Sequence, residues 1–431
     1  MAATEQITYG APDDTRPGEQ LWALIDSTLL VLTIAASSDM LVKLGPVQTL
    51  SWLLCYGLTL LRIGMIFPQF LALAAGNKIV FVYPFICLSS VLWSSAPSES
   101  LVGGIQLLMT CIIATFLGWR YSLTLIIRAV AVILSVAAAL SLLHWATGIF
   151  PWPAFTRAGG LAGIFSHKSM LGLRVLIAAL AILALWLMPT RTISRVSKRW
   201  LVLAMAMVLM SLALSQSATA LLLLPAMAYV LFFLCRDRTP PMVVVLLFVG
   251  AMVIFAIAPL VLTVLGYDPV TFVLNAVGKD ATLTGRTEIW EVAGEVIGEH
   301  PVLGVGFGAF WKASEFSVLR LATQHAGAIT SSSFHNFALE ILVSTGPLGL
   351  LAVAGLIGAG LYRLAALLSL TGSVAAAIGI VLLLTLVATS FLGPALYRGH
   401  DFAMVMVVML VVSAREDMRT ARAALGRGQA G

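Results

Sequence analysis

The feature that most constrains this chain is a series of long apolar runs that recurs throughout the sequence. Many of the runs hold about 20 residues, the length at which an α-helix crosses a hydrocarbon layer roughly 30 Å thick. Of the 431 residues, 60% are hydrophobic and 10% are charged. A soluble domain of that size needs a largely polar surface, so the composition excludes a soluble globular protein. It predicts an all-α polytopic membrane protein.

Hydropathy predicts about 12 transmembrane helices. Their expected ranges are 20–37, 47–66, 78–94, 100–119, 122–147, 169–188, 200–215, 218–234, 241–265, 335–362, 372–393 and 401–414.

Basic residues mark the cytoplasmic side of this bundle. They fill the connection from Arg191 to Arg199, and the C-terminal tail holds four arginines, Arg415, Arg419, Arg422 and Arg427. By the positive-inside rule both segments face the cytoplasm, so the net charge of +6 is a topology signal and we expect no nucleic-acid partner. An even number of spans then places residues 148–168, 266–334 and 394–400 on the outer side.

The same assignment divides the chain into five parts. They are a cytoplasmic N-terminal tail (1–20), transmembrane helices 1–9 (21–265), one large outer, periplasmic loop (266–334), transmembrane helices 10–12 (335–414) and a basic cytoplasmic tail (415–431).

Within the large loop, the stretch GRTEIWEVAGEVIGEHPVLGVGFGAFW is rich in charge and glycine. Its glutamates from Glu288 to Glu299 are spaced 3, 4 and 4, and apolar residues such as Ile289 and Val296 fall on the opposite side of a helix. This pattern predicts an amphipathic surface helix that ends before Pro301. The glutamate row is better explained as a solvated face than as a metal site, because no other residues supply converging ligands.

Arg286 lies at the expected start of this helix, where the helix dipole disfavours a cation unless an anion shares the site. A helix N-terminus with an arginine fork is a good phosphate receptor, although an exposed loop arginine remains an alternative. The glycines Gly304, Gly306 and Gly308 do not form a dinucleotide motif, since Ala309 occupies its last position. We expect them to form a tight turn that packs the loop onto the bundle.

The stretch SSSFHNFALEILVSTGPLGLL begins with three serines before an apolar run. We expect one of them to cap the helix and to place His335 in its first turn. The dipole there favours the neutral imidazole that a general base requires, which makes His335, followed by Asn336, a catalytic candidate. A purely structural interfacial histidine is the alternative.

A further cluster of basic residues lies in TRAGGLAGIFSHKSMLGLRVL. Arg157, His167 and Lys168 fall at the outer face, and Arg174 falls inside an expected span. An unpaired cation at that depth is costly and is therefore a functional candidate. The alternative is that Lys168 and Arg174 extend to the interface.

These motifs together resemble the O-antigen ligase and Wzy polymerase superfamily. GRTEIW, HPVLGVGFGAF and SSFHNFALEILVSTGPLGLL are similar to its core signature. GIFSHKSMLG and LSQSATALLLL are similar to segments of its exopolysaccharide-polymerase (ExoQ-like) branch, in which asparagine usually stands at the position of Ser169.

The resemblance implies a metal-independent, inverting glycosyltransferase with a GT-C-type bundle in the bacterial inner membrane and no cofactor. Its donor would be an undecaprenyl-diphosphate-linked saccharide, used at the periplasmic face, and its acceptor a glycan or lipid-linked glycan. His335 would be the general base. Arg286, with Arg157 or Lys168, would bind the pyrophosphate. The supporting residues would be Asn336, His167, Arg174 and Trp290. A chain-length regulator or export proteins are conceivable partners.

Three functions remain open from the sequence. The first is polymerisation of lipid-linked repeat units, and the second is ligation of a finished glycan to lipid A core or to protein hydroxyls. The third is polysaccharide transport, which the absence of repeated halves with broken helices disfavours.

Overall fold

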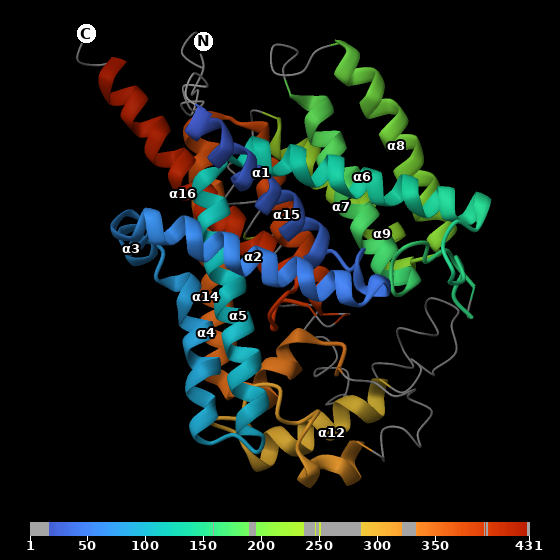
Figure 1. The fold of residues 1–431 in the computed structure, drawn as a ribbon, viewed down its shortest axis with the longest axis vertical. Coiled ribbons are helices and arrows are strands. Elements are labelled where there is room, and N and C mark those ends of the chain that lie inside the picture. The colour runs from blue at the N-terminus through green and yellow to red at the C-terminus, as the bar shows by residue number, and fades with distance from the viewer. Residues whose placement is uncertain are drawn as a thin grey trace.

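The computed structural model describes residues 17–157, 159–188, 195–236, 246, 250, 286–320, 333–391, 393 and 395–428. In this part of the chain the regular structure is helical, apart from one isolated bridge between Phe155 and Leu161. Figure 1 shows the arrangement of the helices.

The helices and their bounds are α1 (Pro17–Ser37), α2 (Pro46–Met65), α3 (Phe67–Gly76), α4 (Ile79–Ser89), α5 (Pro97–Arg120), α6 (Leu123–Thr147), α7 (Lys168–Leu187), α8 (Arg195–Ser215), α9 (Ala218–Leu234), α12 (Arg286–Glu299), α14 (Phe337–Thr371), α15 (Val374–Ser390) and α16 (Phe402–Gly428). Short 3-10 turns are η1 (Val42–Leu44), η2 (Ser90–Leu92) and η3 (Ser314–Phe316).

The chain is a polytopic membrane protein. Among the described residues, six helices are long and apolar enough to cross a membrane, or up to seven if α2 and α3 form one bent span. Three shorter apolar helices, 79–92, 218–234 and 374–390, coincide with further predicted spans. The span expected at 241–265 lies outside the described residues, so the total of twelve stays a prediction.

Two features of the helices differ from the prediction. Helix α3 was not expected, and it is bent by 102° from α2. Pro68 explains the break, because proline is tolerated in the first turn of α3 but would remove a hydrogen bond from the interior of a continuous helix. Helix α16 also continues through the basic tail to Gly428, well beyond the predicted end of its span.

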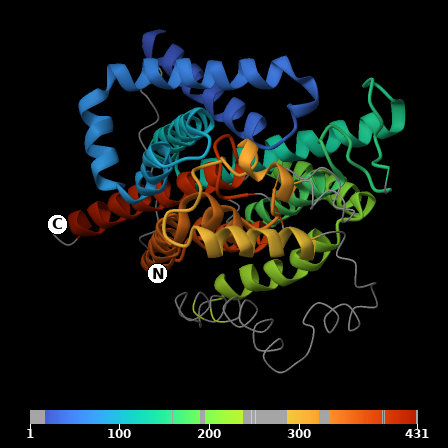
Figure 2. The same ribbon diagram turned by 90° about the horizontal axis from the view of Figure 1, so that it is seen from below.

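The main hydrophobic core lies between α5, α6, α7, α14, α15 and α16. Helix α15 and the apolar half of α16 are buried along almost their whole length, whereas α2 exposes large apolar residues. Helix α2 crosses the front of the view in Figure 1 and lies along an outer edge of the molecule in Figure 2. The apolar surface that α2 exposes is what contact with lipid requires.

Helix α12 lies across one end of the molecule, beside the ends of α4 and α5, and the C-terminus of α16 lies at the other end (Figure 1). Helix α14 packs against α4, α12 and α16 and so connects the two ends. The sequence motifs around Arg286 and His335 therefore meet at the end of the molecule that α12 covers.

Candidate functional site

A second, smaller hydrophobic core gathers the motifs of the predicted outer loop. It joins α12, the glycine-rich turn and the start of α14 through Ile289, Ala293, Val296, Val305, Ala309, Phe310, Ala313, Phe316, Phe334 and Val343. The rings of Phe310 and Phe334 lie 5.0 Å apart, and those of Trp311 and Phe334 lie 4.8 Å apart. The described part of this loop, residues 286–320 and 333–334, is thus packed around its own core, and aromatic packing fixes the residue that precedes His335.

The predicted amphipathic helix is present as α12, from Arg286 to Glu299. Ile289 and Val296 are buried, whereas Glu291, Glu295 and Glu299 are exposed, as expected for a solvated glutamate face. The structure places the backbone of Arg286 in the first turn, but its side chain lies outside what the structure describes. The role of Arg286 as an anion ligand therefore stays a prediction.

A break in α14 receives the glycine-rich turn. Pro347 has no N–H, so it cannot satisfy the carbonyl of Val343 within the helix, and Gly346 is non-helical there (φ 65°, ψ −165°). The amide of Val305 donates to Val343 O at 2.8 Å, and that of Gly306 donates to Ser344 O at 3.0 Å. The turn thus supplies the hydrogen bonds that the break would otherwise leave unmade.

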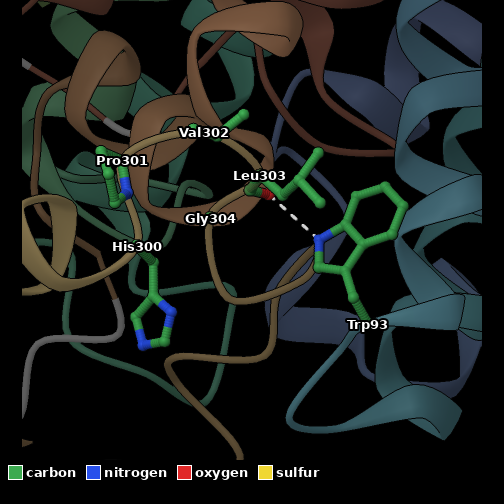
Figure 3. Close-up of a pocket in the computed structure, with 6 residues that line it drawn as sticks. All are labelled: Trp93, His300, Pro301, Val302, Leu303 and Gly304. Carbon is green, nitrogen blue, oxygen red and sulfur yellow. Dashed lines mark hydrogen bonds between the residues drawn. The ribbon is translucent and has the colours of Figure 1, made fainter.

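The other side of the same turn is held by η2 and the start of α5. Ser95 N donates to Val305 O at 3.0 Å, and Ser100 Oγ donates to Phe307 O at 2.8 Å. The indole of Trp93 donates to Leu303 O at 3.1 Å (Figure 3). The turn is therefore fastened between α5 and α14.

The glycines explain how the turn fits into this space. Gly304 and Gly306 have φ of 64° and 104°, a region that side chains rarely adopt. A Cβ on Gly304 would lie 2.8 Å from Thr345 N, and one on Gly306 would lie 2.7 Å from Ser94 Cα. The predicted close-packed turn is confirmed.

The helix that follows His335 begins differently from the prediction. Asn336 is the capping residue of α14, because its Oδ1 accepts from Ala338 N at 3.0 Å and Leu339 N at 3.4 Å. The predicted serine cap is wrong, and His335 precedes the helix instead of lying in its first turn. Asn336 outcompetes Ser333 because it stands directly before the apolar run and caps helices at least as well as serine.

His335 itself adopts a left-handed backbone conformation with φ of 53°. The amide of His335 donates to Ser333 Oγ at 2.9 Å, and His335 is half-buried. A non-glycine residue in this region costs free energy and is held there only by the surrounding structure. The turn thus presents His335 in a fixed position at the N-terminal end of α14.

Two further residues hold this turn. Trp290 on α12 donates through Nε1 to Phe334 O at 2.9 Å. Glu340 is buried and accepts from Phe334 N at 2.6 Å and from the indole of Trp311 at 3.2 Å. Trp290, predicted as a supporting residue, thus contacts the turn at His335, and its part in a reaction stays a prediction. The sequence analysis missed Glu340. An acidic residue one turn into an apolar helix was the signal that could have found it.

The basic residues of the other motif begin α7. His167 caps this helix through Nδ1, which accepts from Ser169 N at 3.3 Å, and Lys168 is its first residue. Burial and the charge of Lys168 lower the pKa of His167. Arg157 is exposed in the preceding loop. The carboxylate of Asp39 accepts from the amide and the hydroxyl of Ser166 and so fastens the segment to the loop after α1.

Arg174 is buried among the helices. Its Nε donates to Ser38 O at 3.0 Å, and its guanidinium lies 4.5 Å from the centre of the Phe402 ring. Asp39 and Asp401 attract it electrostatically. These contacts hold the Arg174 side chain between the end of α1, α7 and the start of α16, and they give it a structural role.

Arg398 is a further cation that the sequence analysis did not single out. It lies between α15 and α16 and feels the charges of Asp401, Glu340 and Asp39. Glu340 binds the turn at His335, and Asp39 binds Ser166 beside His167. Burial lowers the pKa of Arg398, but these charges, together with Tyr397, raise it above its usual value.

His400 in the same loop is sequestered. Its ring stacks on Trp52 at 4.1 Å and its Nε2 lies 2.6 Å from Tyr56 Oη. Burial lowers the pKa of His400 to about 4. It is neutral at physiological pH and packs the loop against α2.

Comparisons with known proteins match the part of the chain that carries most of these residues. Residues 201–354, which include α12, the glycine-rich turn and His335, match the family model described as O-Antigen ligase. The chain is also 28% identical over 341 residues to the exopolysaccharide production protein ExoQ of Rhizobium meliloti (strain 1021), covering 78% of this chain and 75% of that protein. The chain is thus a membrane protein that is similar over residues 201–354 to the O-antigen ligase family, and that is distantly similar to ExoQ.

Proposed function

We propose that this protein polymerises undecaprenyl-diphosphate-linked oligosaccharide repeat units into an exopolysaccharide or another surface polysaccharide. The observation that carries the proposal is the contact between α12 and the His335 turn, made by Trp290 and Phe334. It supports a single site in which the arginine of one motif and the histidine of another act together. The likeness to ExoQ favours an exopolysaccharide product.

In this mechanism the donor enters from the bilayer at the periplasmic face. Its pyrophosphate is bound by Arg286, with Arg157 or Lys168 supplying further positive charge to the leaving group. Cations at this position stabilise the negative charge that develops as the sugar leaves.

His335 is the general base of the proposed reaction. It takes the proton from the acceptor hydroxyl while that oxygen attacks the anomeric carbon. The bond from the anomeric carbon to the pyrophosphate oxygen breaks with its electron pair, so undecaprenyl diphosphate leaves and the configuration inverts. Asn336 caps α14 and thereby fixes the backbone next to the base.

The chemistry needs no metal ion if arginines neutralise the leaving group. Purified enzyme should therefore keep its rate when a chelator such as EDTA is added. Strict dependence of the rate on added Mg²⁺ or Mn²⁺ would contradict this part of the proposal.

The second candidate function is ligation, in which the same chemistry transfers a finished glycan to lipid A core or to a protein hydroxyl. The match to the O-antigen ligase model favours this candidate. Deletion of the gene followed by analysis of surface and lipid-linked glycans separates the two. Lipid-linked single units without long polymer would support the polymerase, and accumulated long lipid-linked polymer would support the ligase. Normal glycans that stay on the cytoplasmic side would instead indicate a transporter.

A further inference from the structure

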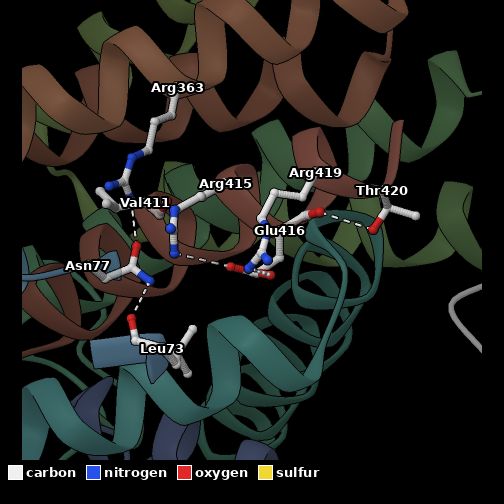
Figure 4. A network of polar contacts seen from close by, with 8 residues as sticks. All are labelled: Leu73, Asn77, Arg363, Val411, Arg415, Glu416, Arg419 and Thr420. Atoms are coloured by element: carbon white, nitrogen blue, oxygen red, sulfur yellow. Dashed lines mark hydrogen bonds and ion pairs between the residues drawn. The ribbon is translucent and has the colours of Figure 1, made fainter. Parts of the chain in front are cut away.

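A cluster of charged residues lies between α14 and α16 (Figure 4). Its α14 member stands in the C-terminal third of that helix, whereas His335 precedes the N-terminal end. The cluster consists of Arg363 on α14 and of Arg415, Glu416 and Arg419 on α16. It contains three arginines and one glutamate, which pairs with Arg415 and Arg419, so its net charge is positive. The next acidic residue, Asp417, accepts from Leu123 N at 3.2 Å and thus serves the start of α6.

Arg363 is held in place by neutral partners. Its NH1 donates to Asn77 Oδ1 at 2.7 Å and to Val411 O at 3.0 Å. Asn77 is itself fixed, because it is fully buried and its Nδ2 donates to Leu73 O at 2.9 Å. These contacts orient the guanidinium without neutralising it, and the repulsion from Arg415 outweighs the attraction of Glu416.

Arg415 lies beside it against the end of α3. A Cβ on Gly76 would come within 2.6 Å of the Arg415 Cζ, so glycine is needed for this close approach. Arg415 and Arg419 reach Glu416 only over 3.5 and 3.3 Å. One carboxylate at such distances satisfies neither guanidinium fully, and both retain donors for another anion.

The surface next to these arginines is apolar. Helix α3 buries Phe70 and Leu73 against the bundle but leaves Phe67 and Leu71 57% and 58% exposed. An apolar helix face beside an uncompensated cationic cluster matches an amphiphile with a phosphate head and hydrocarbon chains. A free phosphate ion would use the arginines alone.

We propose that this cluster binds the phosphate of an anionic phospholipid whose acyl chains lie along α3. Arg363 and Arg415 donate to the phosphodiester oxygens, a contact that guanidinium groups make with good geometry. By the predicted topology the lipid belongs to the cytoplasmic leaflet, opposite to the His335 site. The bound lipid would join α3, α14 and α16 at their ends, and the inference is independent of the sugar chemistry.

The test is lipid binding by the purified full-length protein in detergent, followed by native mass spectrometry. We expect phosphatidylglycerol to bind more tightly than phosphatidylcholine. Arg363→Gln with Arg415→Gln should weaken phosphatidylglycerol binding about 25-fold, since each arginine near a lipid headgroup contributes about fivefold. Arg422→Gln, an exposed residue of the same helix, is the matched control and should change the affinity less than about twofold.

Glu416→Gln provides a test that does not depend on the folding of the double variant. It removes the competing carboxylate, so phosphatidylglycerol should bind more tightly by a few-fold. Equal affinity for the two lipids, equal loss in Arg422→Gln, or unchanged binding in Glu416→Gln would overturn the proposal. Inorganic phosphate that displaces phosphatidylglycerol at millimolar concentration would show a free-anion site and would overturn the assignment to a lipid.

Discussion

The indole of Trp290 donates to the carbonyl of Phe334 at 2.9 Å, so one hydrogen bond ties the helix that begins at Arg286 to the residue before His335. The two motifs are separated in the chain by the glycine-rich turn and by residues outside the described part. Removing this hydrogen bond therefore tests whether the two motifs act together.

Trp290→Phe removes that hydrogen bond and keeps most of the aromatic packing. We expect the folded protein to remain and the rate to fall about fivefold, the value of one ordinary hydrogen bond of about 1 kcal/mol. The measurement is polymer formation by purified enzyme, with thermal unfolding as the control. A wild-type rate from Trp290→Phe would show that this contact does not position the site.

The second prediction concerns Arg286. Arg286→Lys keeps the charge but loses the two-pronged donor, so we expect the rate to fall by roughly 10²-fold if the pyrophosphate is bound through both prongs. Arg157→Lys, in an exposed loop, is the comparison and should have a much smaller effect. Products of wild-type length from Arg286→Ala would remove Arg286 from the mechanism.

The third prediction concerns the general base. His335→Ala should leave the protein folded and lower the rate by about 10²–10⁴-fold. His335→Gln can still hydrogen-bond to the acceptor but cannot take its proton, so it should show a similar loss.

The pH profile distinguishes His335 from the other histidines near the site. The wild-type rate should rise with pH through a limb near pH about 6–7, as a histidine base loses its proton. The pKa of His400 is about 4, and that of His167 is also lowered, so neither is expected to supply that limb. A limb that persists in His335→Gln would contradict the assignment.

The fourth prediction is topological. A cysteine that replaces Lys312 should react with a membrane-impermeant thiol reagent in spheroplasts, and one that replaces Lys198 should not. Cys87 and Cys111 are fully buried and should give little background. Labelling at position 198 alone would mean that the true topology is the reverse of the predicted one. The equivalent position Lys279 lies outside the described residues and tests the same loop.

The fifth prediction compares two glycines of the turn. Gly306→Ala and Gly308→Ala both place alanine at positive φ, which costs about 1–2 kcal/mol. Only Gly306→Ala also brings a Cβ against Ser94, whereas the space at Gly308 is open. Thermal unfolding should therefore show a clearly larger loss of stability for Gly306→Ala. Equal losses would mean that the turn does not pack against η2 as described.

Local patterns in the sequence predicted most of the helices. Hydropathy located most of the described apolar helices, although α14 and α16 continue well beyond the ends predicted at 362 and 414. The glutamate spacing located α12. Both signals depend only on neighbouring residues. The cap of α14 was misassigned although Asn336 was visible, since several good capping residues stand in a row. The bend before α3 had a local signal in Pro68.

The contacts that assemble the site had no local signal. Glu340 and Arg398 matter through partners far away in the chain, and the loop that carries Arg398 is positioned by Asp401, which accepts from Leu396 N and Met404 N. The inward direction of Arg174 likewise depends on Ser38 and Phe402. Such pairings follow from the three-dimensional packing and not from periodicity.

The break at Gly346 and Pro347 also orders the assembly of the protein during synthesis. Val305 and Gly306 are translated before Val343 and Ser344, yet their amides find acceptors only there. By the predicted topology this turn lies on the outer side of the membrane, and it cannot make these two hydrogen bonds until the first half of α14 has been inserted. A chain truncated before residue 343 would lack the carbonyl groups that accept from the glycine-rich turn. The turn therefore reaches its final conformation only after α14 has formed, and it does not guide the formation of α14.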